Sequence, residues 1–222
     1  MNKSQQILCL AAAFISAMLP GAASASSITY TVTADTAGIS GQSGYLDLQL
    51  EPGPASTSLV TASVTKFTTN GTLTGSASLT GDVSGQLPAA LSFDNQTVFN
   101  DYFQPLDFGT TEGFNVTLTG PTLPGGGPSA FNISFYAADG ATPLLTVSSD
   151  GDAGQIVVNP NGTTAVTTFD SGPNAGSALA ITAAVSSSVP EPADLMLIGL
   201  TFAVAVLLGR KRFLSRANSS RL

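Results

Sequence analysis

The central part of this chain of 222 residues predicts an all-β fold, an antiparallel β-sandwich with a jelly-roll-like arrangement. Three observations support this fold class. Residues 26–188, called the head below, contain about ten runs in which apolar and polar residues alternate, as in strands with one buried face. Turn-forming pairs separate these runs, and no window shows a helical period with caps. Serine and threonine fill many polar positions, which suits solvated strand faces.

The expected strands follow one another at the spacing typical of antiparallel β proteins. The second run places Leu46, Leu48 and Leu50 on one face. Asn70-Gly71 and Asn161-Gly162 are dipeptides typical of two-residue hairpin turns. We expect strands at residues 27–33, 45–50, 59–68, 72–83, 115–119, 131–136, 144–147, 156–158, 164–169 and 179–185.

The first 25 residues have the features of a secretory signal peptide. Lys3 gives a positive start, and an almost wholly apolar segment follows at residues 7–19. Ala23 and Ala25 then form the small-residue pattern that signal peptidase recognises. Ser26 would therefore be the first residue of the exported chain.

The composition of the head excludes several kinds of chemistry. The chain has no His and no Trp, and its only cysteine, Cys9, lies in the signal peptide. The head therefore has no thiolate nucleophile, imidazole base, disulfide or Cys/His metal site. Lys66 is its only basic residue against twelve Asp and Glu, so its net charge is one minus twelve, or −11. Such a charge repels phosphate backbones. We expect no cofactor, no bound metal and no nucleic-acid partner.

Residues 93–114 combine six of the thirteen Phe and Tyr of the head with four acidic residues. One interpretation is a glycan platform, in which rings stack on sugars and carboxylates accept hydrogen bonds from hydroxyl groups. Its contacts would include Phe99, Asp101, Tyr102 and Phe103. The other interpretation is that the rings fill the core and the acids lie in turns. The core interpretation is favoured, because the head has few other large residues to fill its core.

Two further acidic patterns carry weaker implications. Asp150-Gly151-Asp152 resembles the start of a calcium loop, but calcium takes about six oxygen ligands or more, and the next carboxylate is Asp170. A simple turn is the favoured interpretation. Twelve acids also allow a carboxylate pair suited to glycoside hydrolysis, although no motif selects one.

The C-terminal part contains three segments in a fixed order: Val189-Pro190-Glu191-Pro192, then apolar residues 195–209, then Arg210-Lys211-Arg212. Fifteen residues at about 1.5 Å each give a transmembrane helix of about 22 Å, which is short against a bilayer core of about 30 Å. The basic cluster places the tail, residues 214–222, in the cytoplasm and the head outside. A plain membrane anchor and a processing signal both fit these residues.

This order of segments resembles the PEP-CTERM sorting signal of Gram-negative bacteria over residues 189–213. The resemblance implies that an exosortase, an integral membrane enzyme, reads the Pro-Glu-Pro segment and cleaves near it. It also implies a link to exopolysaccharide and biofilm. The head resembles a recurrent head type of this family, for which we know no assigned activity. That resemblance rests on Gly44-Tyr45-Leu46-Asp47, Gly81-Asp82-Val83-Ser84-Gly85 and Asn100-Asp101-Tyr102-Phe103.

We therefore expect an exported protein that is cleaved by signal peptidase and first held in the inner membrane by its C-terminus. An exosortase would then deliver it to the cell surface or the extracellular matrix. The expected role is non-enzymatic, structural or in interactions, and linked to exopolysaccharide. A carbohydrate-binding module is the alternative, and a carboxylate-based glycoside hydrolase is the third.

Overall fold

The computed structural model describes residues 27–54, 58–120, 126–169 and 178–184, which form two β-sheets. The six-stranded sheet has the order β14 (Leu179–Ala183), β1 (Ser27–Asp35), β9 (Thr111–Thr119), β3 (Thr61–Thr69), β7 (Leu91–Asp94) and β6 (Val83–Gly85). The eight-stranded sheet has the order β13 (Thr164–Thr168), β12 (Asp152–Val158), β10 (Ser129–Ala137), β2 (Ser43–Pro52), β8 (Asp101–Asp107) and β4 (Thr72–Leu73), with β11 (Pro143–Leu144) paired to β10 and β5 (Ser78–Thr80) paired to β8.

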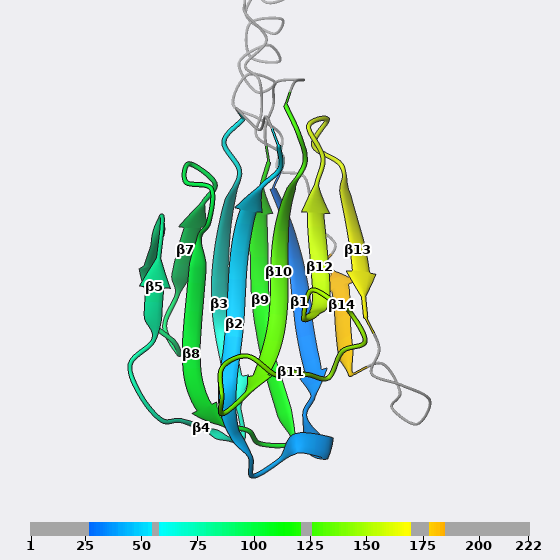
Figure 1. The fold of residues 1–222 in the computed structure, drawn as a ribbon. Coiled ribbons are helices and arrows are strands. Elements are labelled where there is room, and N and C mark those ends of the chain that lie inside the picture. The colour runs from blue at the N-terminus through cyan, green and yellow to red at the C-terminus, as the bar shows by residue number, and fades with distance from the viewer. Residues whose placement is uncertain (1–26, 55–57, 121–125, 170–177, 185–222) are drawn as a thin grey trace, which may run out of the picture. The chain divides into compact units, whose positions relative to one another are not determined.

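Every strand pairing in the described residues is antiparallel. The two sheets form two layers, with β2, β8, β10 and β12 in one and β1, β3 and β9 in the other (Figure 1). The only helical element in the described part of the chain is the 3₁₀ turn η1 (Ala37–Ile39). The prediction of an all-β antiparallel fold is confirmed.

A single hydrophobic core fills the space between the sheets. Alternation produces it, because every second side chain of a strand points to the same face. Leu46, Leu48 and Leu50 of β2 are completely buried, as predicted. Phe114 and Val116 of β9 come from the opposite layer into the same core. The side chains between these positions consequently face outward, and on β2 they build the site described below.

The two Asn-Gly dipeptides have different roles. Asn161-Gly162 closes the β12–β13 hairpin, as predicted. The hairpin predicted at Asn70-Gly71 is wrong, because β3 pairs with β7 and β9, whereas β4 pairs with β8 in the other sheet. The dipeptide is a crossover between sheets, held by the Asn70 side chain, whose Oδ1 accepts hydrogen bonds from the backbone N–H groups of Thr110 and Thr111 at 2.8 and 3.1 Å.

A buried asparagine joins three segments next to the start of β8. Asn100 is completely buried, and its Nδ2 donates to the carbonyl oxygens of Leu50 and Thr97, both at 2.9 Å. Its Oδ1 accepts a hydrogen bond from the backbone N–H of Asp82 at 2.8 Å and a second one from the Thr97 hydroxyl. This amide therefore fixes the chain immediately before Asp101.

The core contains one carboxyl group. Glu112 of β9 is 1 % exposed, and its Oε1 accepts a hydrogen bond from Thr69 Oγ1 at 2.8 Å. Its Oε2 is buried without a hydrogen-bond partner. Burial raises the pKa of this carboxyl from 4.5 to about 7, although the Thr69 hydroxyl and the Gly109 backbone oppose the shift. Near neutral pH the protonated form is thus a large fraction of the folded state.

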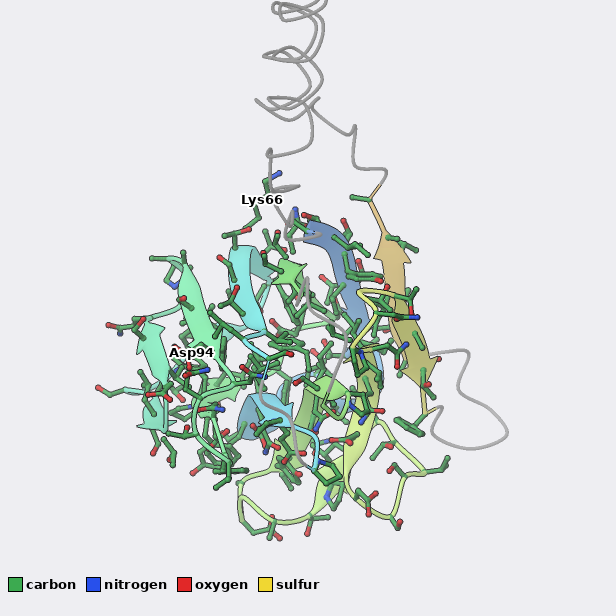
Figure 2. All side chains as sticks on the ribbon, turned by 90° about the horizontal axis from the view of Figure 1, so that it is seen from above. Lys66 and Asp94 are labelled. Carbon is green, nitrogen blue, oxygen red and sulfur yellow. The ribbon has the colours of Figure 1, made fainter. Side chains whose placement is uncertain are left out.

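Lys66, the sole basic residue of the head, occupies a β-bulge in β3. The pairing of β3 with β9 shifts between Thr65 and Thr68, and Lys66 takes a left-handed conformation with φ of 55°. Its side chain is exposed and projects from the edge of the head, well apart from Asp94 of β7 (Figure 2). The bulge lets Phe67 turn inward, where it is 8 % exposed.

Several predicted segments lie outside the described residues. They are the signal peptide with Ala23, Ala25 and Ser26, the Val189-Pro190-Glu191-Pro192 segment, the apolar residues 195–209, and the Arg210-Lys211-Arg212 cluster. Among the residues that the structure does describe, no helix has the length and apolar character needed to cross a bilayer. The sorting signal therefore stays a prediction from sequence.

Candidate functional site

The outer face of the eight-stranded sheet carries three aromatic rings on three neighbouring strands. Tyr45 of β2 and Phe103 of β8 are stacked, with ring centroids 4.4 Å apart and planes at 17°. Tyr136 of β10 lies directly opposite Tyr45 in the strand register, and its ring is 6.0 Å from that of Phe103. All three rings are half-buried. Their positions follow from alternation, since Leu46 beside Tyr45 faces the core.

Two glycine turns lie against the edge of these rings. A Cβ at Gly140 would meet Phe103 and Tyr45 at 3.7 Å, and a Cβ at Gly151 would meet the Tyr136 hydroxyl at 2.7 Å. Both glycines have positive φ, of 67° and 90°, which a left-handed turn requires. The turns thus frame the aromatic group and leave the rings partly open to solvent.

A pair of carboxyl groups adjoins the rings on the same face. Asp47 of β2 is 4 % exposed, and its Oδ2 accepts a hydrogen bond from Gln49 Nε2 at 2.7 Å. The Oδ1 atoms of Asp47 and Asp101 are both buried and have no partner when both groups are ionised. Burial, then hydrogen bonding to Asp101, raises the pKa of Asp47, and burial raises that of Asp101. A proton shared between the two carboxyls satisfies both orphaned oxygens.

A row of amide side chains extends this face across β12, β10 and β2. Gln155 Nε2 donates to Asn132 Oδ1 at 2.9 Å, and Asn132 Nδ2 donates to Glu51 Oε2 at 3.5 Å. Gln49 lies opposite Asn132 in the register of β2 and β10. Amide and carboxyl groups supply both donors and acceptors, as polyhydroxylated ligands require. We call the rings, the carboxyl pair, this row and Asp152, which lies opposite Ser134 in the register of β12 and β10, the outer face: Tyr45, Phe103, Tyr136, Asp47, Asp101, Asp152, Glu51, Gln49, Asn132 and Gln155.

A fourth carboxyl group of the outer face is Asp152, at the start of β12. Its Oδ1 accepts a hydrogen bond from Ser134 Oγ at 3.1 Å. Burial raises the pKa of Asp152, and the charges of Glu51 and Asp150 add to this effect. In the described residues no group of three or more His, Cys, Asp or Glu side chains is arranged to hold a metal ion. The stretch around Gly151 is a turn that leads into β12.

The carboxyl pair does not have the geometry of a glycosidase. Asp47 and Asp101 are in hydrogen-bond contact. The two carboxyl groups of a retaining glycosidase are about 5 Å apart, and those of an inverting enzyme are farther apart still. The pair is therefore suited to shaping the charge of the face rather than to acid and nucleophile roles.

The four residues expected to contact a glycan lie in different parts of the structure. Asp101 and Phe103 lie on the outer face, and Phe99 is 41 % exposed in the β7–β8 loop. Tyr102 is completely buried, so it is corrected to a core residue: its hydroxyl accepts from the Leu87 backbone N–H and donates to Gln104 Oε1, both at 2.9 Å. Phe93, Phe108 and Phe114 are also core residues. The core interpretation of residues 93–114 therefore holds for four of the six rings.

Of the glycan contacts predicted from sequence, Asp101 and Phe103 are the two that belong to the outer face. Tyr45, Asp47 and Gln49 follow from the alternation of β2, because they alternate along the strand with its buried leucines. Tyr136 and Asn132 on β10 become neighbours of these residues only through sheet pairing between segments more than 80 residues apart. The sequence carries no signal for that pairing.

The three stretches on which the head resemblance rests meet in space. Gly44 to Asp47 pairs with Phe103 to Leu106 in the β2–β8 ladder. The backbone N–H of Asp82 bonds to the side chain of Asn100. The first and the third of these stretches supply Tyr45, Asp47, Asp101 and Phe103 to the outer face. Comparison of the chain with protein-family models, with curated proteins and with solved structures found no match.

Proposed function

We propose that this chain is an exported, non-enzymatic interaction protein of the cell surface or extracellular matrix, and that its head binds carbohydrate. The outer face is the observation that carries the binding role. Its rings offer flat apolar surfaces to the C–H faces of sugars, and its amide and carboxyl groups offer hydrogen-bond partners to hydroxyls. Exopolysaccharide made by the same cell is the natural ligand class under this proposal.

Export and sorting form the second part of the proposal. Its support is the signal-peptide pattern ending at Ala25 and the three ordered segments from Val189 to Arg212. Signal peptidase and an exosortase are the processing partners, and the inner membrane is the first location of the C-terminus. A Glu191→Ala variant, or deletion of residues 190–192, leaves the full-length protein in the inner membrane. An unchanged mature product in an unchanged location overturns the sorting proposal.

We further infer a jelly-roll-like path for the head. Its support is that successive long strands alternate between the layers, with β1, β3 and β9 in one sheet and β2, β8 and β10 in the other. This alternation places residues from β2, β8 and β10 side by side, although they are distant in sequence. A rigid face built in this way holds a ligand without a large ordering cost.

The carbohydrate proposal is tested with the full-length chain in detergent micelles on a glycan array. Tyr45→Ala and Phe103→Ala remove rings of the outer face, and Val98→Ala, at a position 88 % exposed in the β7–β8 loop, is the control. We expect each ring variant to lose binding while its thermal unfolding stays cooperative. A wild-type chain that binds no glycan, or folded ring variants that bind normally, would contradict the proposal.

A further inference from the structure

The outer face carries a concentration of negative charge with no basic residue among its members. Glu51, Asp101 and Asp152 contribute carboxylates from β2, β8 and β12. Lys66, the only basic residue in the described head, lies in the other sheet and projects from its edge (Figure 2). Glycans with uronate or sulfate groups are therefore repelled from this face, whereas a cationic ligand is attracted.

Asp47 provides an independent pointer to a cationic group. Asp47 is 4 % exposed, and its Oδ1 has no partner when Asp47 and Asp101 are ionised. A buried unpaired carboxylate destabilises the fold, so the Asp47–Asp101 pair binds either a proton or another positively charged group. The neutral hydroxyls of a plain glucan supply no such charge.

The aromatic rings of the outer face also attract cations. The face of an aromatic ring carries negative potential, and an ammonium group within about 6 Å of a ring centroid is attracted to it. Tyr45 and Phe103 are stacked next to the carboxyl pair, and Asp47 lies opposite Phe103 in the strand register. Rings and carboxyls thus converge on one part of the face.

We propose that the outer face takes a glycan with free amino groups, a partly deacetylated hexosamine polymer. The ammonium groups lie against Asp101 and Asp152, and the sugar rings lie on Tyr45 and Phe103. This inference rests on the proposed carbohydrate-binding function and names its ligand class. The proposed cation is an ammonium group and not a metal ion, because the described residues contain no group of three side chains arranged to bind a metal.

The test compares four bead-bound polymers with the full-length chain in detergent: a deacetylated hexosamine polymer, its fully acetylated form, a neutral glucan and a uronate polymer. We expect the deacetylated polymer to bind at least about tenfold more tightly than the acetylated form, with loss of that advantage at about 0.5 M salt. Asp101→Asn, a nearly isosteric change, lowers binding to the deacetylated polymer about tenfold. Asp152→Asn also lowers binding to the deacetylated polymer.

The matched control is Asp94→Asn on β7, which removes the same charge from the other sheet. We expect it to keep binding within about twofold of wild type, because its charge is remote and screened. Equal losses in the Asp101 and Asp94 variants would show attraction by net charge alone and overturn the inference. Tighter binding to the uronate or neutral polymer would overturn it while the carbohydrate function stands. Binding abolished by a chelator would overturn it in favour of a metal ion, and no binding to any polymer would defeat the proposed function itself.

Discussion

Replacement of Glu112 by glutamine tests the effect of a carboxyl group inside the core. The fold raises the pKa of Glu112 from 4.5 to about 7, because the side chain is 1 % exposed and one oxygen has no partner. The folded state therefore favours the protonated form. The contribution of this group to stability is fully present below pH 4.5 and is lost as the pH rises to about 7.

The size of the effect follows from the same two pKa values. Each pKa unit corresponds to about 1.4 kcal/mol, so ionisation of Glu112 costs the folded state about 3 kcal/mol. Glutamine never ionises, but its buried NH₂ group lacks an acceptor at the position of Oε2, which costs about 1–2 kcal/mol. We expect Glu112→Gln to be more stable than wild type by about 1–2 kcal/mol at pH 8, and no more stable at pH 4.

Urea unfolding of the full chain at several pH values between 4 and 8 measures this difference. The relevant quantity is the variant minus wild-type free energy of unfolding, because the other buried carboxyls contribute equally to both proteins. Val98→Ala, at a position 88 % exposed, removes no titratable group and is the control, which should leave the pH profile unchanged. A difference that does not vary with pH, or a variant that is less stable than wild type at pH 8, would refute the reasoning.

Substitutions at three further positions test other parts of the fold. Gly44→Ala should destabilise the head by more than about 2 kcal/mol in urea unfolding, because the new Cβ would lie 2.2 Å from the Tyr136 carbonyl oxygen; a neutral effect would contradict this packing. Asn100→Ala should lower the free energy of unfolding by about 3 kcal/mol in the same assay, since two carbonyl groups and an N–H lose their partner. A decrease below about 1 kcal/mol would show that water replaces the amide as the partner of these groups. Lys66→Gly should raise the melting temperature by a few degrees, because glycine adopts the left-handed conformation at position 66 without strain. Lys66→Gln removes only the charge and should leave the melting temperature unchanged. Equal effects of the two variants would assign the change to charge.

The sequence predicts the class of fold because alternation is a local property. The leucines at 46, 48 and 50 fix the inner face of β2, and the Asn161-Gly162 pair fixes the β12–β13 register. Pairing between distant strands is not local. Asn70-Gly71 has the residues of a hairpin, yet the chain crosses there to the other sheet, because the Asn70 side chain binds the backbone of Thr110 and Thr111.

The candidate site was predictable only in part for the same reason. Asp101 and Phe103 stand out as a local mixture of acid and ring, and both reach the outer face. Tyr102 shares that mixture, but alternation sends it inward, where its hydroxyl bonds to Leu87 and Gln104. Tyr136 joins the site through its position opposite Tyr45, which depends on the whole sheet order. A count of rings and acids in a window does not contain that information.

The single basic residue of the head has a consequence for its resistance to proteolysis. Proteases of the trypsin type cut only after lysine or arginine, so between residues 26 and 188 they find one susceptible bond, after Lys66. That bond lies in the β3 bulge, where the ladder to β9 is interrupted, and Phe67 on its far side is anchored in the core. A protease must draw Phe67 out of the core by local unfolding before it can fit an extended segment into its cleft. A head without disulfides thus has few cleavable bonds to expose, and it should outlast neighbouring proteins that are rich in lysine.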